Sequence, residues 1–258
     1  MWGSFVNLLF DILKQIYLVV GDWGLAIIVF TIALRLLMTP LMVKQVRGTH
    51  EMQKMQPMIK NIQEKYKDDK DEQAKKMQEL YAETGFNPLA SCLPMLLQMP
   101  LFVALYQMLG ASTEKRLGPF AEYVASNPDS GNFLSFLPNL FSADGGVVPG
   151  LTASASEVFQ GFGVISALPY ILLIALFGLS IYIPSLITPN QQANQKTMMI
   201  SMAVLMLFFG WNTPAGVLLY WDTSSIIGVA QQWFTQKMLD KASDNEELVV
   251  VKETKKGK

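Results

Sequence analysis

The chain has 258 residues, of which 51% are hydrophobic and only 16% are charged. The apolar residues gather in long blocks and nearly all charges lie between them, which is typical of a membrane protein and excludes an ordinary soluble domain. The formal net charge of −1 says little about partners, and the single cysteine, Cys92, excludes an intramolecular disulfide and a cysteine-rich zinc site.

Residues 1–21 predict an amphipathic helix in the outer membrane interface, because apolar residues recur at helical spacing and polar residues interrupt the run. A signal peptide is the alternative. Against it stand the lack of a basic N-terminal region and of a small-residue cleavage site. A signal removed ahead of residue 1 remains open.

Five later segments predict transmembrane helices. The first three are long enough to cross a bilayer alone, and the last two are separated only by the turn signal Asn-Thr-Pro-Ala, which predicts a transmembrane hairpin. The five segments are 22–43, 89–111, 164–187, 197–211 and 216–234. The predicted fold class is therefore all-α, a polytopic membrane protein.

The distribution of basic residues sets the orientation. Residues 44–84 contain nine Lys and Arg, whereas the longer segment 112–163 contains two. Basic loops stay in the cytoplasm, so 44–84 and the tail 235–258 are expected there, and 112–163 is expected to be a partly helical extracytoplasmic loop. The result is an N-out, C-in protein.

The cytoplasmic segment 44–84 predicts a helical hairpin that breaks within 65–73 and ends near Gly85, where glycine precedes Pro88. Its nine basic and eight acidic residues nearly cancel, as in a solvated helix pair. Each helix carries a narrow apolar stripe, which packing of the two helices on each other explains about as well as a docking surface does. Methionines within the stripe favour docking.

Arg35 is a permanent charge near the middle of the span 22–43. Such an arginine almost always faces protein or water, and it lies too far from the end of the span to reach the interface easily. Thr31 is one turn earlier on the same helical face, so this face predicts a wet cavity.

Two further spans carry polar residues. Gln98 and Gln107 are nine residues apart and face opposite ways on a helix, so at most one of them can share a cavity with Arg35. The span 216–234 carries a polar stripe that reaches toward the cytoplasm, for which small-residue helix packing is the alternative. Its members are Trp221, Ser224, Ser225, Gly228 and Gln232.

Asp222 is the second charge within a span. It either pairs with Arg35 or reaches the outer interface, since Pro214 is only eight residues away. His50, the only histidine, is expected on the surface. No nucleophile motif and no phosphate-binding loop is found, so the chain is not expected to be an enzyme or to bind a metal or cofactor.

Four stretches resemble one known family, the YidC/Oxa/Alb membrane protein insertases, in the short bacterial form without a large periplasmic domain. They are "RLLMTPLMVKQ" (35–45), "MQPMIKNIQEKYKDDK" (55–70), "GFNPLASCLPMLLQMPLFVALYQML" (85–109) and "PAGVLLYW" (214–221).

The resemblance implies five helices around a hydrophilic groove that is open to the cytoplasm and to lipid and sealed toward the outside. Arg35 matches the family's groove arginine, Thr31 its threonine one turn earlier, and Tyr220 and Trp221 the aromatics after the Pro-Ala-Gly turn. With Gln98 and Ser225 these residues form the candidate groove. Asp222 and the sequence "SIYIPSLI" (180–187) depart from the family pattern, so the groove polarity is expected to be distributed differently here.

The resemblance also implies nascent membrane proteins as clients, with the hairpin and the tail as contacts for the ribosome and targeting machinery, all at the bacterial cytoplasmic membrane. It leaves open whether the Sec translocon takes part. No small-molecule substrate is expected. The main alternative is a secondary transporter with a buried Arg/Asp site, which internal repeats would favour, and none is seen.

Overall fold

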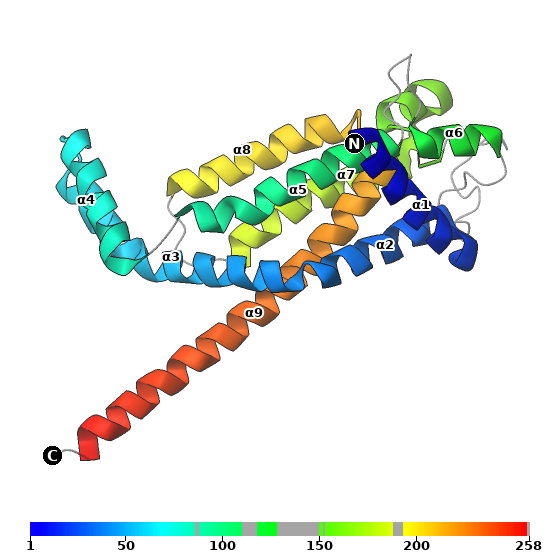
Figure 1. The fold of residues 1–258 in the computed structure, drawn as a ribbon. Coiled ribbons are helices and arrows are strands. Elements are labelled where there is room, and N and C mark those ends of the chain that lie inside the picture. Colours follow the sequence, from blue (N-terminus) through cyan, green and yellow to red (C-terminus); the bar gives the residue numbers. More distant parts are fainter. Residues whose placement is uncertain (86–87, 110–117, 128–149, 152, 188–192, 257–258) are drawn as a thin grey trace. The chain divides into compact units, whose positions relative to one another are not determined.

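The structure is a computed structural model that describes residues 1–258 except 86–87, 110–117, 128–149, 152, 188–192 and 257–258. The described part is helical, with an isolated antiparallel bridge between Ser154 and Pro214 as its β pairing (Figure 1). The helices are α1 (Trp2–Val20), α2 (Trp23–Leu37), α3 (Thr39–Lys65), α4 (Lys70–Thr84), α5 (Pro88–Met108), α6 (Pro119–Ser126), α7 (Ala155–Ile187), α8 (Ala193–Gly210) and α9 (Ala215–Lys256). The all-α prediction is confirmed for these residues.

The chain divides into two compact units. The first consists of Met1–Leu37 and Gln98–Gly228, and the second of Met38–Leu97 and Val229–Lys258. Helices α5 and α9 each contribute a part to both units. All residues of the candidate groove belong to the first unit.

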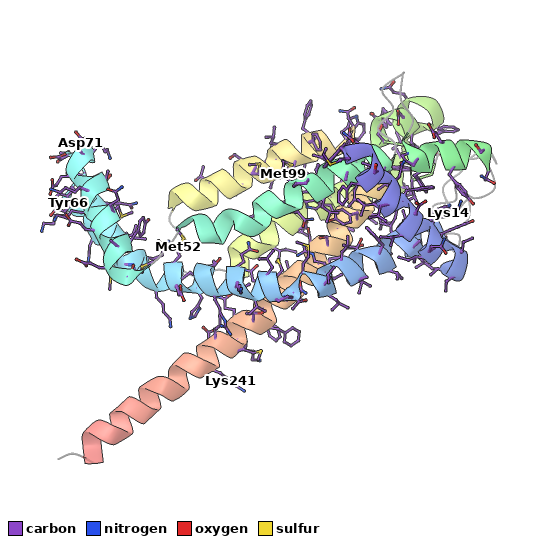
Figure 2. The ribbon with its side chains drawn as sticks, viewed as in Figure 1. Lys14, Met52, Tyr66, Asp71, Met99 and Lys241 are labelled. Carbon is purple, nitrogen blue, oxygen red and sulfur yellow. The ribbon has the colours of Figure 1, made fainter. Side chains whose placement is uncertain are left out.

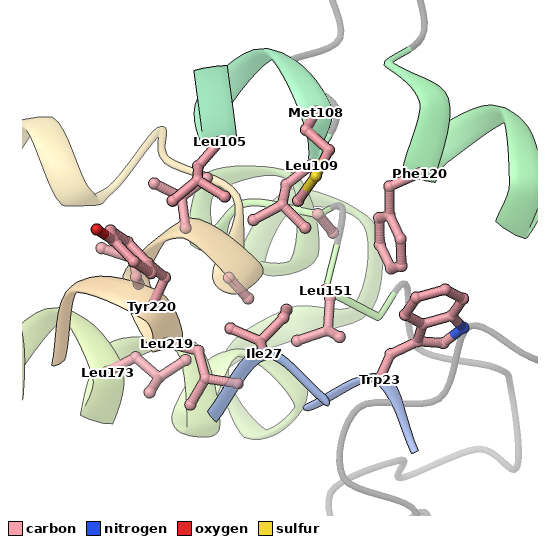
Figure 3. Packing of buried hydrophobic residues seen from close by; sticks show 14 of the residues in the cluster. Trp23, Ile27, Leu105, Met108, Leu109, Phe120, Leu151, Leu173, Leu219 and Tyr220 are labelled. Carbon is pink, nitrogen blue, oxygen red and sulfur yellow. The ribbon is translucent and has the colours of Figure 1, made fainter. Parts of the chain in front are cut away.

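The core of the first unit is apolar and lies among α1, α2, α5, α6, α7 and α9. Trp23, at the start of α2, is fully buried and stacks on Tyr17 of α1 with ring centroids 4.0 Å apart. Phe120 of α6 contacts the same indole edge-on, with ring centroids 4.9 Å apart, and Leu109 and Leu151 are buried nearby (Figure 3). This aromatic cluster fixes the N-terminal helix to the bundle.

Helix α7 begins earlier than the predicted span 164–187 and contains a break at Gly163, whose φ of 82° is one that favours glycine. The predicted start at residue 164 coincides with this break. Ahead of the break, Ser154 and Glu157 form a capping box. The Glu157 carboxylate accepts the Ser154 backbone N–H at 2.8 Å, and the Ser154 hydroxyl accepts the Glu157 N–H at 3.4 Å.

The turn between α8 and α9 is paired with the residues before α7. Backbone N–H groups of Ala215 and Gly216 donate to the carbonyls of Ala153 at 2.9 Å and Leu151 at 2.8 Å. The turn itself lies at 211–214, where "NTPA" predicted one. These bonds satisfy backbone groups that the start of α9 leaves without intrahelical partners.

By length and composition, two described helical segments can cross a membrane alone, Trp2–Val20 and Ala155–Ile183, and a third can do so if α2 and α3 count as one broken span. The interruption follows from Pro40, which lies in the first turn of α3, where its missing N–H does no harm. A shorter apolar stretch covers Ile200–Gly210 in α8. The interfacial position predicted for residues 1–21 stays a prediction, as does the five-span count.

In the second unit, α3 and α4 form a helical hairpin, as the sequence pattern predicts, and its cytoplasmic location stays a prediction. The turn lies at 66–69, with Tyr66 and Asp71 at that end of the hairpin (Figure 2). The Asp69 side chain caps α4 by accepting the Glu72 N–H at 3.0 Å. Gly85 ends α4 with a φ of 64°, so the predicted glycine cap is confirmed.

Beyond residue 228, α9 continues without a break to Lys256, although the sequence predicts a span ending at 234 and then a tail. Part of this extension is tied to α3. Gln231 donates to the Thr39 hydroxyl at 2.9 Å and Gln236 donates to Gln53 at 3.3 Å. His50 is also part of this contact and not a surface residue as predicted, because its side chain is only 14% exposed and lies 3.7 Å from Asp240.

Candidate functional site

Arg35 lies in the last turn of α2, and its side chain reaches α9. Its Nε donates to the Ser224 hydroxyl at 2.8 Å. One turn further along α9, a side chain on Gly228 would lie 3.0 to 3.2 Å from the guanidinium atoms, so the arginine packs closely on the helix at that point. The arginine is half-buried, and Ser224 is 5% exposed.

A second polar contact lies one turn earlier on α9. The Tyr220 hydroxyl accepts a hydrogen bond from the Gln98 amide of α5 at 2.5 Å, and Tyr220 is 2% exposed. Residues 220, 224 and 228 follow one another at steps of four and therefore share a face of α9. The side chains that meet on this face are Gln98 of α5, Tyr220 and Ser224 of α9, and Arg35 of α2. We call these four residues the polar line.

Gln107 is placed as the nine-residue spacing predicted. It lies on the other side of α5 from Gln98 and accepts a hydrogen bond from the Trp2 indole N–H at 2.7 Å. Gln107 therefore ties α1 to α5, whereas Gln98 belongs to the polar line. The geometric prediction that the two glutamines face opposite ways is confirmed.

Thr31 is fully buried one turn before Arg35. Its hydroxyl donates to the backbone carbonyl of Ile27 at 2.6 Å, the usual intrahelical partner of a threonine in an apolar environment. Trp221 is packed between two aromatic rings, Phe102 at 5.2 Å and Phe177 at 5.1 Å, both edge-on. It therefore contributes apolar packing between α5, α7 and α9.

The residue that sequence reasoning did not select is Ser224. The stripe contained both serines, and Ser225 was chosen, but Ser224 is the one that meets Arg35. Adjacent residues on a helix point about 100° apart, so the choice between the two serines depends on how α9 is rotated. The three-and-four spacing of the stripe is compatible with either serine. Ser224, however, lies four residues from both Tyr220 and Gly228 and so shares their face.

Asp222 does not pair with Arg35 in the described residues. It is two positions, or about 200°, from Ser224 on α9 and so faces another way. The side chain is 4% exposed, and neither carboxylate oxygen has a hydrogen-bond partner among the described residues. The alternative, that Asp222 lies at the level of the outer interface, stays a prediction.

Within the described residues, no three His, Cys, Asp or Glu side chains gather as they would around a metal ion. An apolar cavity of about 280 Å³ lies between α5 and α8, with Tyr106, Leu205 and Phe209 among its lining residues. The polar line is therefore the candidate functional site.

Apolar helices around a half-buried arginine and its polar neighbours define a helical membrane protein with a line of polar residues inside its bundle. A family model described as "60Kd inner membrane protein" matches residues 15–242. The chain belongs to this family, the YidC/Oxa/Alb family that its motifs resemble.

Relatives of this chain are named as membrane protein insertases. Membrane protein insertases YidC of Francisella tularensis subsp. novicida and of subsp. tularensis are each 34% identical over 234 residues, which cover 90% of this chain and 36% of the relative. The chain thus spans about a third of the length of these relatives. A crystal structure of an active YidC insertase with its first transmembrane domain resolved superposes with a TM-score of 0.62 at 27% identity, covering 88% of this chain and 45% of that one.

Proposed function

We propose that the chain is a membrane protein insertase of the bacterial cytoplasmic membrane, with five spans, N-out and C-in, and with α1 in the outer interface. Membership of the family and the names of its relatives support this. In this proposal the groove runs along Arg35, Gln98 and Tyr220, with Ser224 beside the arginine.

The observation that carries the proposal is the position of Arg35. Its Nε is bonded to Ser224 inside a bundle of apolar helices, next to the Gln98–Tyr220 pair. A guanidinium keeps its charge at any physiological pH and is costly in hydrocarbon, so a polar lining and water offset that cost. The same charge attracts an acidic segment strongly, because the surrounding dielectric is low.

The proposed mechanism follows from the free energy that it costs to move polar residues through the hydrocarbon of the membrane. A client chain must carry polar, often acidic, residues of its outer segment through hydrocarbon, at several kcal/mol for each unsatisfied group. A groove that reaches part of the way across shortens this path, and Arg35 holds the acidic residues there. The apolar segment of the client then leaves sideways into lipid, and the membrane potential adds to the driving force.

The partners proposed are nascent membrane proteins as clients, with the α3–α4 hairpin and the extension of α9 as contacts for the ribosome and targeting machinery. The hairpin is solvated on most of its surface, and Met58 is 52% exposed on α3. That methionine supports docking of apolar segments of varied shape.

The test is insertion into lipid vesicles that contain only the purified protein. A radiolabelled single-span test protein with a short acidic outer segment is added during translation, and insertion is read as a protease-protected fragment. The proposal expects protection well above that of empty vesicles. The absence of protection, with uptake of a small solute instead, would favour the transporter, whose Arg/Asp site the geometry of Asp222 does not support. Adding the Sec translocon to the same vesicles shows whether it contributes.

A further inference from the structure

Arg35 is held at two points on α9, and both are set by small residues. The first is the hydrogen bond from Nε to the Ser224 hydroxyl at 2.8 Å. The second is the close approach at Gly228, where the two terminal nitrogens and Cζ lie 3.0, 3.1 and 3.2 Å from the position that a Cβ would take. Because these three distances are nearly equal, the flat face of the guanidinium covers the glycine.

This arrangement depends on the shape of an arginine. Nε is a donor that lysine lacks, and a planar group can lie against a helix where a side chain is missing. A Cβ at 228 would lie 3.0 to 3.2 Å from the guanidinium, so even alanine requires it to shift by a few tenths of an ångström and a larger side chain displaces it further. Glycine also weakens a helix interior relative to alanine, so its presence here has a cost that the close packing of Arg35 explains.

We propose that Ser224 and Gly228 are positioning residues that hold the Arg35 guanidinium at one depth on α9, where it meets the acidic segment of a client. The proposal rests on the proposed function for its biological meaning. Its geometric part, the fixed guanidinium, is independent of that function and can be measured separately.

The geometric part is tested by NMR on the full chain in lipid nanodiscs, with ¹⁵N-labelled arginine. The chain has three arginines, Arg35, Arg47 and Arg116, so the Arg35 Nε–H signal can be assigned by its loss in Arg35→Lys. Ser224→Ala is expected to shift this signal and to speed its exchange with water about threefold or more, because the acceptor is gone. Ser180→Ala is the matched control, since its hydroxyl bonds the Phe177 carbonyl of α7 at 2.7 Å. An unchanged Arg35 signal in Ser224→Ala would overturn the proposal.

The functional part uses the vesicle assay with two test proteins that differ only in their outer segment, one acidic and one with Asn and Gln in place of the acidic residues. Ser224→Ala and Gly228→Val are expected to reduce insertion of the acidic protein about threefold to tenfold and to leave the neutral one within about twofold. Gly161→Ala, at a helical glycine with open space around it, is the control for Gly228. An equal loss for both test proteins would mean a structural role and would contradict the proposal.

A double-mutant cycle with Arg35→Lys separates positioning from folding. Lysine has no Nε, so Ser224→Ala is expected to have no further effect in the Arg35→Lys background, whereas it is harmful in the wild type. Equal effects in both backgrounds would overturn the role of Ser224. If Arg35→Ala itself leaves both test proteins unaffected while the NMR result holds, the proposed function fails at this residue and the fixed guanidinium stands.

Discussion

Arg35 of α2 and Ser224 of α9, 189 positions apart in the chain, are joined by a hydrogen bond of 2.8 Å between Nε and the serine hydroxyl. This bond places the only basic side chain of the predicted spans on the face of α9 that also carries Tyr220. The charge therefore has a polar neighbour on the partner helix and does not depend on Asp222.

Tyr220 and Gln98 are expected to stabilise the bundle as a pair. Tyr220→Phe removes the hydroxyl that accepts from Gln98 at 2.5 Å and leaves a half-buried amide without that partner, at a cost of about 1 to 3 kcal/mol. Replacing both residues, as in Tyr220→Phe with Gln98→Leu, is expected to cost less than the sum of the two single changes. Thermal unfolding in nanodiscs measures this. A double variant as unstable as the sum would show that the pair is not coupled.

Asp222 is expected to be dispensable for stability. Its carboxylate is buried and lacks a hydrogen-bond partner among the described residues, so it adds a cost that no contact offsets. Asp222→Asn keeps the shape and removes the charge, and the unfolding temperature should stay level or rise. A fall of several degrees would mean that the carboxylate has a stabilising partner in the membrane.

Gly178 of α7 is expected to accept a side chain only if Leu207 of α8 moves aside. A Cβ there would lie 2.5 Å from Cδ2 of Leu207 in α8, so the two helices are in close contact at this point. Gly178→Ala should cost about 1 to 3 kcal/mol through overpacking, and Leu207→Ala in the same chain should recover part of it. Gly161→Ala serves as the control because its surroundings are open. Loss of stability in Gly178→Ala that Leu207→Ala fails to relieve would contradict the packing seen between α7 and α8.

The α3–α4 hairpin offers a pH test. Lys76 donates to the Glu79 carboxylate at 2.7 Å on α4, and this hydrogen bond lowers the pKa of Glu79 and raises the pKa of Lys76. The contribution of Glu79 to α4 is thus present above its unfolded pKa and is lost as the pH falls through its lower folded pKa. The contribution of Lys76 is lost only as the pH rises through its raised pKa. Both groups are exposed, so the effect on stability is small.

Carboxyl ¹³C NMR of Glu79 checks the pair directly. Lys76→Met should move the Glu79 titration midpoint to higher pH, because the donor and the positive charge are both removed. A midpoint that does not move would show that the pair does not form in solution.

Local signals in the sequence predicted much of the fold. Glycine at 85 before Pro88 located the end of α4, and the nine-residue spacing of Gln98 and Gln107 gave their opposite directions. Both follow from the geometry of one helix. The break at Met38 ahead of Pro40 was not predicted, because an apolar run continues across it and hides a proline that is harmless at a helix start.

The candidate site was predicted only in part, since it depends on the rotation of one helix against another. Arg35 could be selected because a charge inside a span is costly. The neighbour that meets it could not, because Ser224 and Ser225 are adjacent in the sequence and only packing decides which of them faces α2. The burial of His50 beside Asp240 was missed for the same reason, since it comes from the contact of α3 with the extension of α9.

The measurement that tests the central claim most directly is insertion of the acidic and the neutral test protein by vesicles that contain the wild type, Arg35→Lys or Arg35→Ala. Arg35→Ala should reduce insertion of the acidic protein about tenfold, which corresponds to about 1.4 kcal/mol of lost attraction. Arg35→Lys should retain part of the activity, and the neutral protein should be much less affected by either change. Equal insertion of the acidic protein by the wild type and by Arg35→Ala would contradict the proposal that this arginine receives the polar segments of clients.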